Sequence, residues 1–218
     1  MLSSSLITLV LIWLVSLVSA EASGLLVYRL MSRRNSGLST ARVLPILDTV
    51  IVSLRLATLY IILAYTGFDL VELFGLGTWC LAGIALSSLG LIVVALFDAY
   101  FSGYRRGEPW EFQLMDYRLY KKNRIQRFCF LRVLYYFSEI TIVNTLYLLG
   151  NEAIKLPCPL LTGGLIAVLV GWALLHVFTK DLNTVLDVTM YSLVAFTVAY
   201  YTGSMVYPII AWFLILII

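Results

Sequence analysis

The sequence predicts an all-α protein, a polytopic bundle of about seven transmembrane helices. Two features of its composition support this: 61% of the 218 residues are hydrophobic, and only 12% are charged. A soluble domain carries about 25% charged residues, so this chain lacks the polar surface needed to face water. The third feature is that apolar residues gather in runs long enough to cross a hydrocarbon layer of about 30 Å. This composition excludes a disordered chain, a disulfide-stapled secreted module and a nucleic-acid binder.

Seven apolar segments are predicted to cross the membrane as helices, because irregular backbone facing lipid would leave its amides unpaired. They cover residues 2–28, 43–66, 75–101, 128–149, 160–178, 182–201 and 205–218. An alternative interpretation of the first segment is a secretory signal peptide, since Ala20-Glu21-Ala22 has the pattern of a cleavage site. Against this alternative, no Lys or Arg precedes the apolar run, and the run continues beyond the cleavage pattern.

The distribution of basic residues predicts the orientation of the bundle. Four arginines follow the first span and seven Lys or Arg residues follow the third. The charged residues in the connection after the second span are Asp69 and Glu72. Those in the connection after the fourth span are Glu152 and Lys155. Positive charge in short connections marks the cytoplasmic side. We therefore expect an N-terminus outside and a C-terminus inside.

The chain divides into three predicted parts: a three-helix membrane segment (1–101), a basic cytoplasmic segment (102–127) and a four-helix membrane segment (128–218). The basic segment interleaves aromatic residues with its charges, which is typical of an in-plane interfacial helix on anionic lipid. A solvated loop is the alternative. The residues expected to meet lipid headgroups are Arg105, Arg106, Trp110, Lys121 and Lys122.

Some charged residues fall inside the predicted spans, where each costs about 2.5 to 3.5 kcal/mol on insertion scales. Asp48 and Arg55 are seven residues apart and share one helix face. We expect Arg55, near mid-span, to pair with a carboxylate on another helix; contact with a polar cavity or substrate is the alternative. Asp98 and Asp187 lie near span ends and are expected to reach the interface, although Asp187 is also a candidate for a buried charge network with Asp48 and Arg55.

Glu139 and His176 are the candidate catalytic residues. Glu139 lies about eleven residues into the fourth span, where a carboxylate meets little water. His176 is the only histidine and closes the fifth span. A neutral imidazole there is able to orient a water or accept a proton. The alternative is an interfacial histidine that anchors the end of the helix.

The order of these residues is similar to that of a known family. Residues 130–218, about two-fifths of the chain, resemble the CAAX-processing and bacteriocin-processing (CPBP) intramembrane glutamic peptidases. That family carries the motifs E-E-x-x-x-R, F-x-x-x-H and, after a Gly-Ser-aromatic-x-Pro turn, H-x-x-x-N. Ser138-Glu139 matches the first motif in part, and Trp172 to His176 stands at the second. Residues 203–208, Gly-Ser-Met-Val-Tyr-Pro, resemble the approach to the third.

The resemblance implies a membrane-embedded peptidase in which Glu139 and His176 activate water, but four polar positions of the family pattern are replaced. They are taken by Ser138, Val143, Trp212 and Leu216. Losing one oxyanion donor typically costs about 10² to 10³ in rate. We therefore expect a catalytically impaired relative that acts as a binding scaffold for a membrane partner or peptide. The alternative is an accessory subunit or small transporter whose buried charges line a pathway.

The sequence indicates no cofactor, metal or nucleic-acid partner. Cys80, Cys129 and Cys158 lie far apart and form no ligand pattern. They are interpreted as small packing residues.

Overall fold

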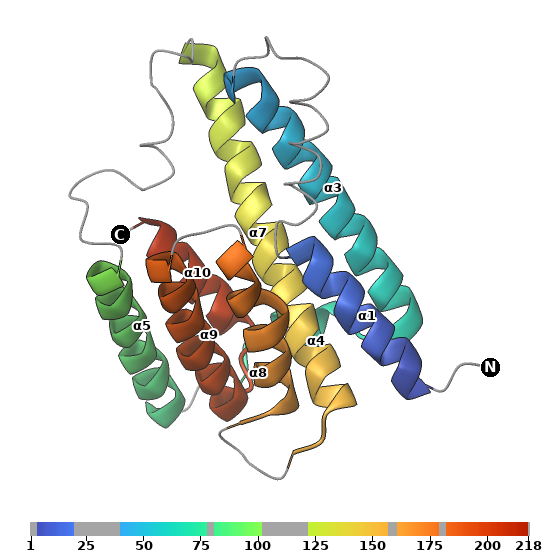
Figure 1. Cartoon of the computed structure of the whole chain (residues 1–218). Helices are drawn as coiled ribbons and strands as arrows, with labels where there is room; N and C mark the ends of the chain where they lie inside the picture. Colours follow the sequence, from blue (N-terminus) through green and yellow to red (C-terminus); the bar gives the residue numbers. More distant parts are fainter. Residues whose placement is uncertain are drawn as a thin grey trace.

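The computed structural model describes residues 4–19, 40–77, 81–101, 122–156, 161–178 and 182–217. The regular structure in these stretches is all helical, which confirms the predicted all-α class (Figure 1). The helices are α1 (Ser4–Ser19), α3 (Thr40–Thr66), α4 (Leu70–Phe74), α5 (Leu81–Phe101), α7 (Lys122–Ala153), α8 (Gly163–Val168), the π-helix η2 (Leu169–Ala173), the 3₁₀-helix η3 (Leu174–Phe178), α9 (Leu182–Thr202) and α10 (Val206–Ile217).

Four helical stretches are long and apolar enough to cross a membrane, as expected of a membrane protein. They are Asp48–Thr66, Leu81–Tyr100, Val133–Ala153 and Leu182–Thr202. Two shorter apolar helices, Gly163–Val177 and Val206–Ile215, accompany them, and α1 has 16 residues. The predicted count of seven crossings and the orientation of the termini stay predictions.

Helix α7 lies at the centre of the bundle, with α1 and α3 on one side and α8, α9 and α10 on the other (Figure 1). Within its apolar stretch 78% of the residues are buried, compared with 22% for the stretch in α3 and 17% for that in α5. A polar group on α7 therefore meets other helices, whereas most of the apolar stretches of α3 and α5 is not buried within the bundle.

Small residues bring α8 close to α7. A Cβ atom on Gly150 would lie 2.5 Å from the Cβ of Ala167, and one on Gly163 would lie 2.5 Å from the carbonyl oxygen of Gly150. Membrane helices use glycine in this way to approach closely. The side chain of Asn151 on α7 also accepts a hydrogen bond from the amide of Gly164, at 2.7 Å.

The helical run from Gly163 to Phe178 changes type twice, from α to π and then to 3₁₀. Thr162 caps its start by accepting a hydrogen bond from the amide of Leu165. Gly171 lies within the π-turn, where a Cβ atom would come within 2.4 Å of the Ser16 hydroxyl on α1. Such π-turns frequently occur at functional sites; this one contains Trp172, and the 3₁₀-helix that follows contains His176.

The structure alters three of the predicted boundaries. The third predicted span, 75–101, is interrupted, because α5 begins only at Leu81. The acidic connection before it contains a short helix, α4, instead of a loop. Helix α7 begins at Lys122, so part of the basic segment is helical and continuous with the apolar stretch. Residues 122–127 include Lys, Arg and Gln, which favour helix, and contain neither proline nor glycine.

Other predictions fall outside the described residues. These include the headgroup contacts of Arg105, Arg106, Trp110 and Lys121 and the signal-peptide pattern at residues 20–22. Lys122 is the first residue of α7.

Candidate functional site

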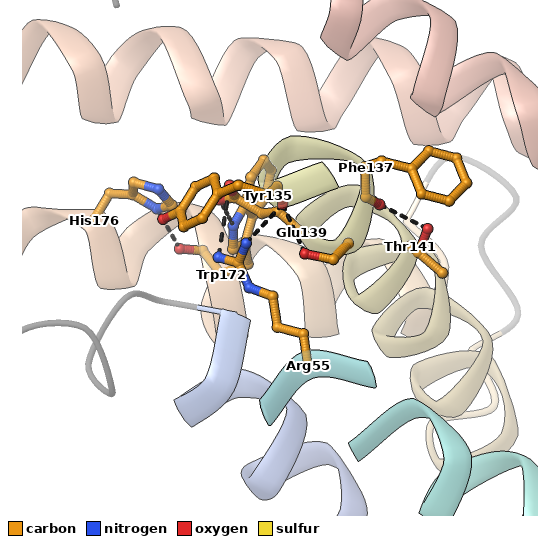
Figure 2. Close-up of polar contacts among 8 residues, drawn as sticks. Arg55, Tyr135, Phe137, Glu139, Thr141, Trp172 and His176 are labelled. Atoms are coloured by element: carbon orange, nitrogen blue, oxygen red, sulfur yellow. Dashed lines mark hydrogen bonds and ion pairs between the residues drawn. The ribbon is translucent and has the colours of Figure 1, made fainter. Parts of the chain in front are cut away.

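The carboxylate of Glu139 is held by donors from two other elements. Arg55 on α3 places Nη2 3.6 Å from Oε2 of Glu139, and Trp172 on η2 donates from Nε1 to Oε1 at 3.2 Å. The side chains of Arg55 and Glu139 are 0% and 3% exposed. Figure 2 shows Arg55 reaching from α3 toward Glu139 and Trp172. The three side chains tie α3, α7 and η2 together at one point.

Tyr135, one turn before Glu139, supplies further contacts to the Arg55 guanidinium. Nη1 of Arg55 donates to the carbonyl oxygen of Tyr135 at 2.9 Å, and Cζ lies 4.4 Å from the centroid of the tyrosine ring. The same carbonyl accepts a hydrogen bond from the Ser138 hydroxyl. A buried cation is tolerated when it is paired and hydrogen-bonded, and a desolvated cation–π contact adds about 2 kcal/mol. The predicted pairing of Arg55 with a carboxylate on another helix is thus present, and Glu139 is a carboxylate that it contacts.

His176 lies on the other side of Trp172 and is also buried. Its Nδ1 is 2.9 Å from the carbonyl oxygen of Trp172. Because a carbonyl oxygen only accepts, Nδ1 carries the proton, and in the neutral ring Nε2 keeps its lone pair. The two rings pack edge to face, 5.3 Å between centroids. Trp172 therefore connects the two candidate catalytic residues, with its indole on Glu139 and its main chain on His176 (Figure 2).

An aromatic cluster of Trp172, Tyr191 and Trp212 brings α9 and α10 to this site. Trp212 lies 5.2 Å from Trp172 and 5.0 Å from Tyr191, centroid to centroid. The Tyr191 hydroxyl donates to the carbonyl oxygen of Pro208 at 2.6 Å. Nε1 of Trp212 is buried without a hydrogen-bond partner in the described part of the chain. Sequence reasoning missed Tyr135 and Tyr191, because a tyrosine in an apolar helix carries no signal of its neighbours.

The remaining candidates of the charge network lie elsewhere in the bundle. Asp48 is buried on α3, two turns before Arg55. Asp187 on α9 is buried close to Asp98 on α5, which is also buried, and the two carboxyl groups interact. Both side chains are buried where α5 packs on α9, and their expected position near the headgroups stays a prediction.

The geometry of Glu139 is that of a structural ion pair. Oε2 of Glu139 faces the Arg55 guanidinium and Oε1 accepts from the Trp172 indole, so the carboxylate ties α7 to α3 and to η2. Within the described residues, no group of three or more His, Cys, Asp or Glu side chains is arranged to hold a metal ion.

Comparisons of the chain with protein-family models, with curated proteins and with solved structures find no match.

Proposed function

We propose that this protein is a non-catalytic membrane scaffold with a peptidase-like core, which binds a partner helix or an extended peptide within the bilayer. The observation that carries the proposal is the engagement of both Glu139 oxygens by Arg55 and Trp172. An acid held in this way joins three helical elements, which favours a structural role for Glu139 over a catalytic one.

The convergence of three distant segments supports the peptidase-like part of the proposal. Glu139 on α7, Trp172 and His176 on η2 and η3, and Trp212 on α10 form one contiguous cluster. The CPBP resemblance places its three motifs at these positions. Other apolar helices of the chain could have packed beside Glu139 instead, so the meeting of these three segments supports the resemblance.

The nature of the third segment supports binding over catalysis. The family's histidine at this point helps to steady an oxyanion, and here the indole of Trp212 takes its place between Trp172 and Tyr191. Its N–H is a buried donor without a partner in the described part of the chain. A buried donor of this kind favours binding of a carbonyl oxygen from a partner.

We further propose seven crossings, with the basic connections on the cytoplasmic side and anionic lipid at residues 102–127. The alternation of charge along the chain supports this topology. Together with the four long apolar helices, it favours an integral, multi-pass location.

A peptidase assay on the full-length chain in liposomes tests the absence of catalysis. Casein and a prenylated CAAX peptide serve as substrates, with parent, Glu139→Gln and His176→Ala proteins compared. Glu152→Gln is the matched control, because Glu152 lies on the same helix but is exposed. We expect no cleavage by any of the four. Cleavage by the parent and the control, lost in the other two variants, would restore the enzyme interpretation.

Crosslinking in native membranes tests the scaffold. A photoreactive amino acid at Leu174, exposed on η3 near His176, is expected to capture one discrete partner. The same group at Leu89, exposed on α5, serves as the control and is expected to capture lipid. Identical products from both positions would remove the support for a partner site.

An alternative proposal is an accessory subunit or small carrier whose buried charges line a pathway. The contact between Asp98 and Asp187 favours it, since paired buried acids mark ion pathways in membrane proteins. Proton flux into liposomes measures this function directly. We expect flux to be lost in Arg55→Leu and Asp187→Asn if the alternative holds, and absent from the parent if the scaffold proposal holds.

A further inference from the structure

Residues 67–77 form a strap that leads from the end of α3 toward the start of α5. The strap contains the five-residue helix α4. A capping box closes the first turn of α4, because Asp69 accepts from the amide of Glu72 and Glu72 accepts from the amide of Asp69. Helix α4 is therefore closed at its start by residues of the strap itself.

A glycine in the left-handed conformation stands at each end of the strap. Gly67 has φ +75° and Gly77 has φ +71°, values that other residues rarely adopt. A Cβ atom on Gly67 would meet nothing within 4 Å, whereas one on Gly77 would lie 2.3 Å from the carbonyl oxygen of Thr202 and 2.6 Å from the amide nitrogen of Ser204. One end of the strap is thus unhindered, and the other is seated on the turn between α9 and α10.

A small set of directional contacts holds the strap on the bundle. Nδ2 of Asn144, on α7, donates to the carbonyl oxygens of Leu73 and Met205, at 3.2 and 2.8 Å. The carbonyl oxygen of Gly75 accepts from the amides of Met205 and Val206, at 2.8 and 3.3 Å. The buried amide side chain of Asn144 therefore joins α7 both to the strap and to Met205, the residue before α10.

The apolar contacts of the strap are limited. Leu73 is fully buried, and the ring of Phe74 stacks on that of Phe137 at 5.8 Å. In contrast, Val71 is 74% exposed and Leu76 is 58% exposed. Segments with little buried apolar area open locally at a lower free energy than the whole fold. The strap therefore has a glycine at each end, a helix that is capped by its own residues, and little buried apolar area. These three features are those of a segment that can move separately from the bundle.

We propose that the strap is a latch that moves by rotation at its two terminal glycines, Gly67 and Gly77, and is held shut by Asn144. When it opens, the amide of Asn144, Ser204 and the first turn of α10 are uncovered, while the helices around Glu139 stay packed. The latch goes beyond the scaffold function and does not depend on it.

Cysteine labelling of the full-length chain in nanodiscs tests the latch. The three native cysteines are replaced, and Ser204→Cys, at a buried position under the strap, reports opening to a membrane-impermeant maleimide. Ser192→Cys, buried on α9, reports general loosening of the bundle. In the parent background we expect both sites to label slowly.

Asn144→Asp removes both amide donor bonds without changing the size of the side chain. We expect Ser204→Cys to label about tenfold faster in this background, because the bond to Leu73 is lost and a carboxylate would face two carbonyl oxygens, while Ser192→Cys stays protected. Gly77→Ala, which displaces the seated end, is expected to act in the same direction. Asn151→Asp is the matched control on the same helix, because Asn151 uses its oxygen as an acceptor and the variant keeps that bond.

Two results would overturn the latch. One is an unchanged labelling rate at Ser204→Cys in both Asn144→Asp and Gly77→Ala. The other is a parallel rise at Ser192→Cys, which would mean that the whole bundle loosens and that the strap does not move separately.

Discussion

The bundle buries two pairs of ionisable side chains, and the two pairs offset the free-energy cost of burying charge in different ways. At the centre, Arg55 and Glu139 have opposite charges, and Trp172 and the Tyr135 carbonyl complete their contacts. Toward the edge, Asp98 and Asp187 are both buried acids that interact with each other. Two neighbouring buried acids favour sharing a proton, because two negative charges would repel each other. The central pair thus balances a cation against an acid, while the outer pair depends on a proton.

The largest expected effect comes from removing one partner of the central pair. Arg55→Leu leaves the Glu139 carboxylate buried without its cation, which typically costs about 3 to 5 kcal/mol. The free energy of unfolding in detergent micelles, measured by denaturant titration, checks this value. Lys155→Leu is the control, because Lys155 pairs with Glu152 on the surface and such changes stay within about 0.5 kcal/mol. Equal stability of the two variants would contradict a structural role for the central pair.

Removing both partners is expected to undo most of that loss. Buried ion pairs replaced by apolar residues of similar size are often neutral or stabilising by about 1 to 4 kcal/mol. The double variant Arg55→Met with Glu139→Leu should therefore unfold at a higher denaturant concentration than Arg55→Leu. A double-mutant cycle on the free energies of unfolding measures the coupling between the two residues. Additive losses would show that the 3.6 Å contact contributes nothing.

The sequence predicted the apolar helices well, because hydropathy and length decide whether a segment can cross a bilayer. It also predicted that Arg55 would pair with a carboxylate on another helix, because an unpaired charge in lipid is too costly. It did not identify Glu139 as the partner, since four carboxylates lay within or near the spans and spacing along the chain does not fix contacts between helices.

The sequence also did not predict the contact between Asp98 and Asp187 or the strap, because both depend on how distant segments pack. The burial of Asp98 against Asp187 depends on how α5 packs on α9, and each residue alone looks like the end of a span. The sequence prediction assigned residues 67–74 of the strap to a loop and residues 75–77 to the third span. Gly75 and Gly77 lie among apolar residues, so hydropathy alone did not show that the strap continues to Gly77. Asn144 in an apolar helix gave no indication that its amide holds main-chain carbonyls from two other segments.

A smaller effect is expected from the indole donor of the central pair. Trp172→Phe removes the hydrogen bond to Oε1 of Glu139 and keeps an aromatic ring beside His176 and Trp212. An acceptor left unsatisfied costs about 1 to 3 kcal/mol. Denaturant titration of this variant, alone and combined with Glu139→Leu, separates the lost bond from altered ring packing. The cost should shrink in the combined variant, and an unchanged cost would assign it to packing.

The smallest expected effect has the opposite sign and separates the two pairs most clearly. Asp187→Asn supplies an amide donor to Asp98, so the contact no longer needs a shared proton, and the free energy of unfolding at neutral pH should rise by about 1 kcal/mol. The same acid-to-amide change at the centre, Glu139→Gln, takes away the charge that Arg55 requires and should lower it. Both variants are measured by denaturant titration in the same micelles. If the two changes shift stability in the same direction, the outer acids have some other role than a proton-dependent contact between α5 and α9.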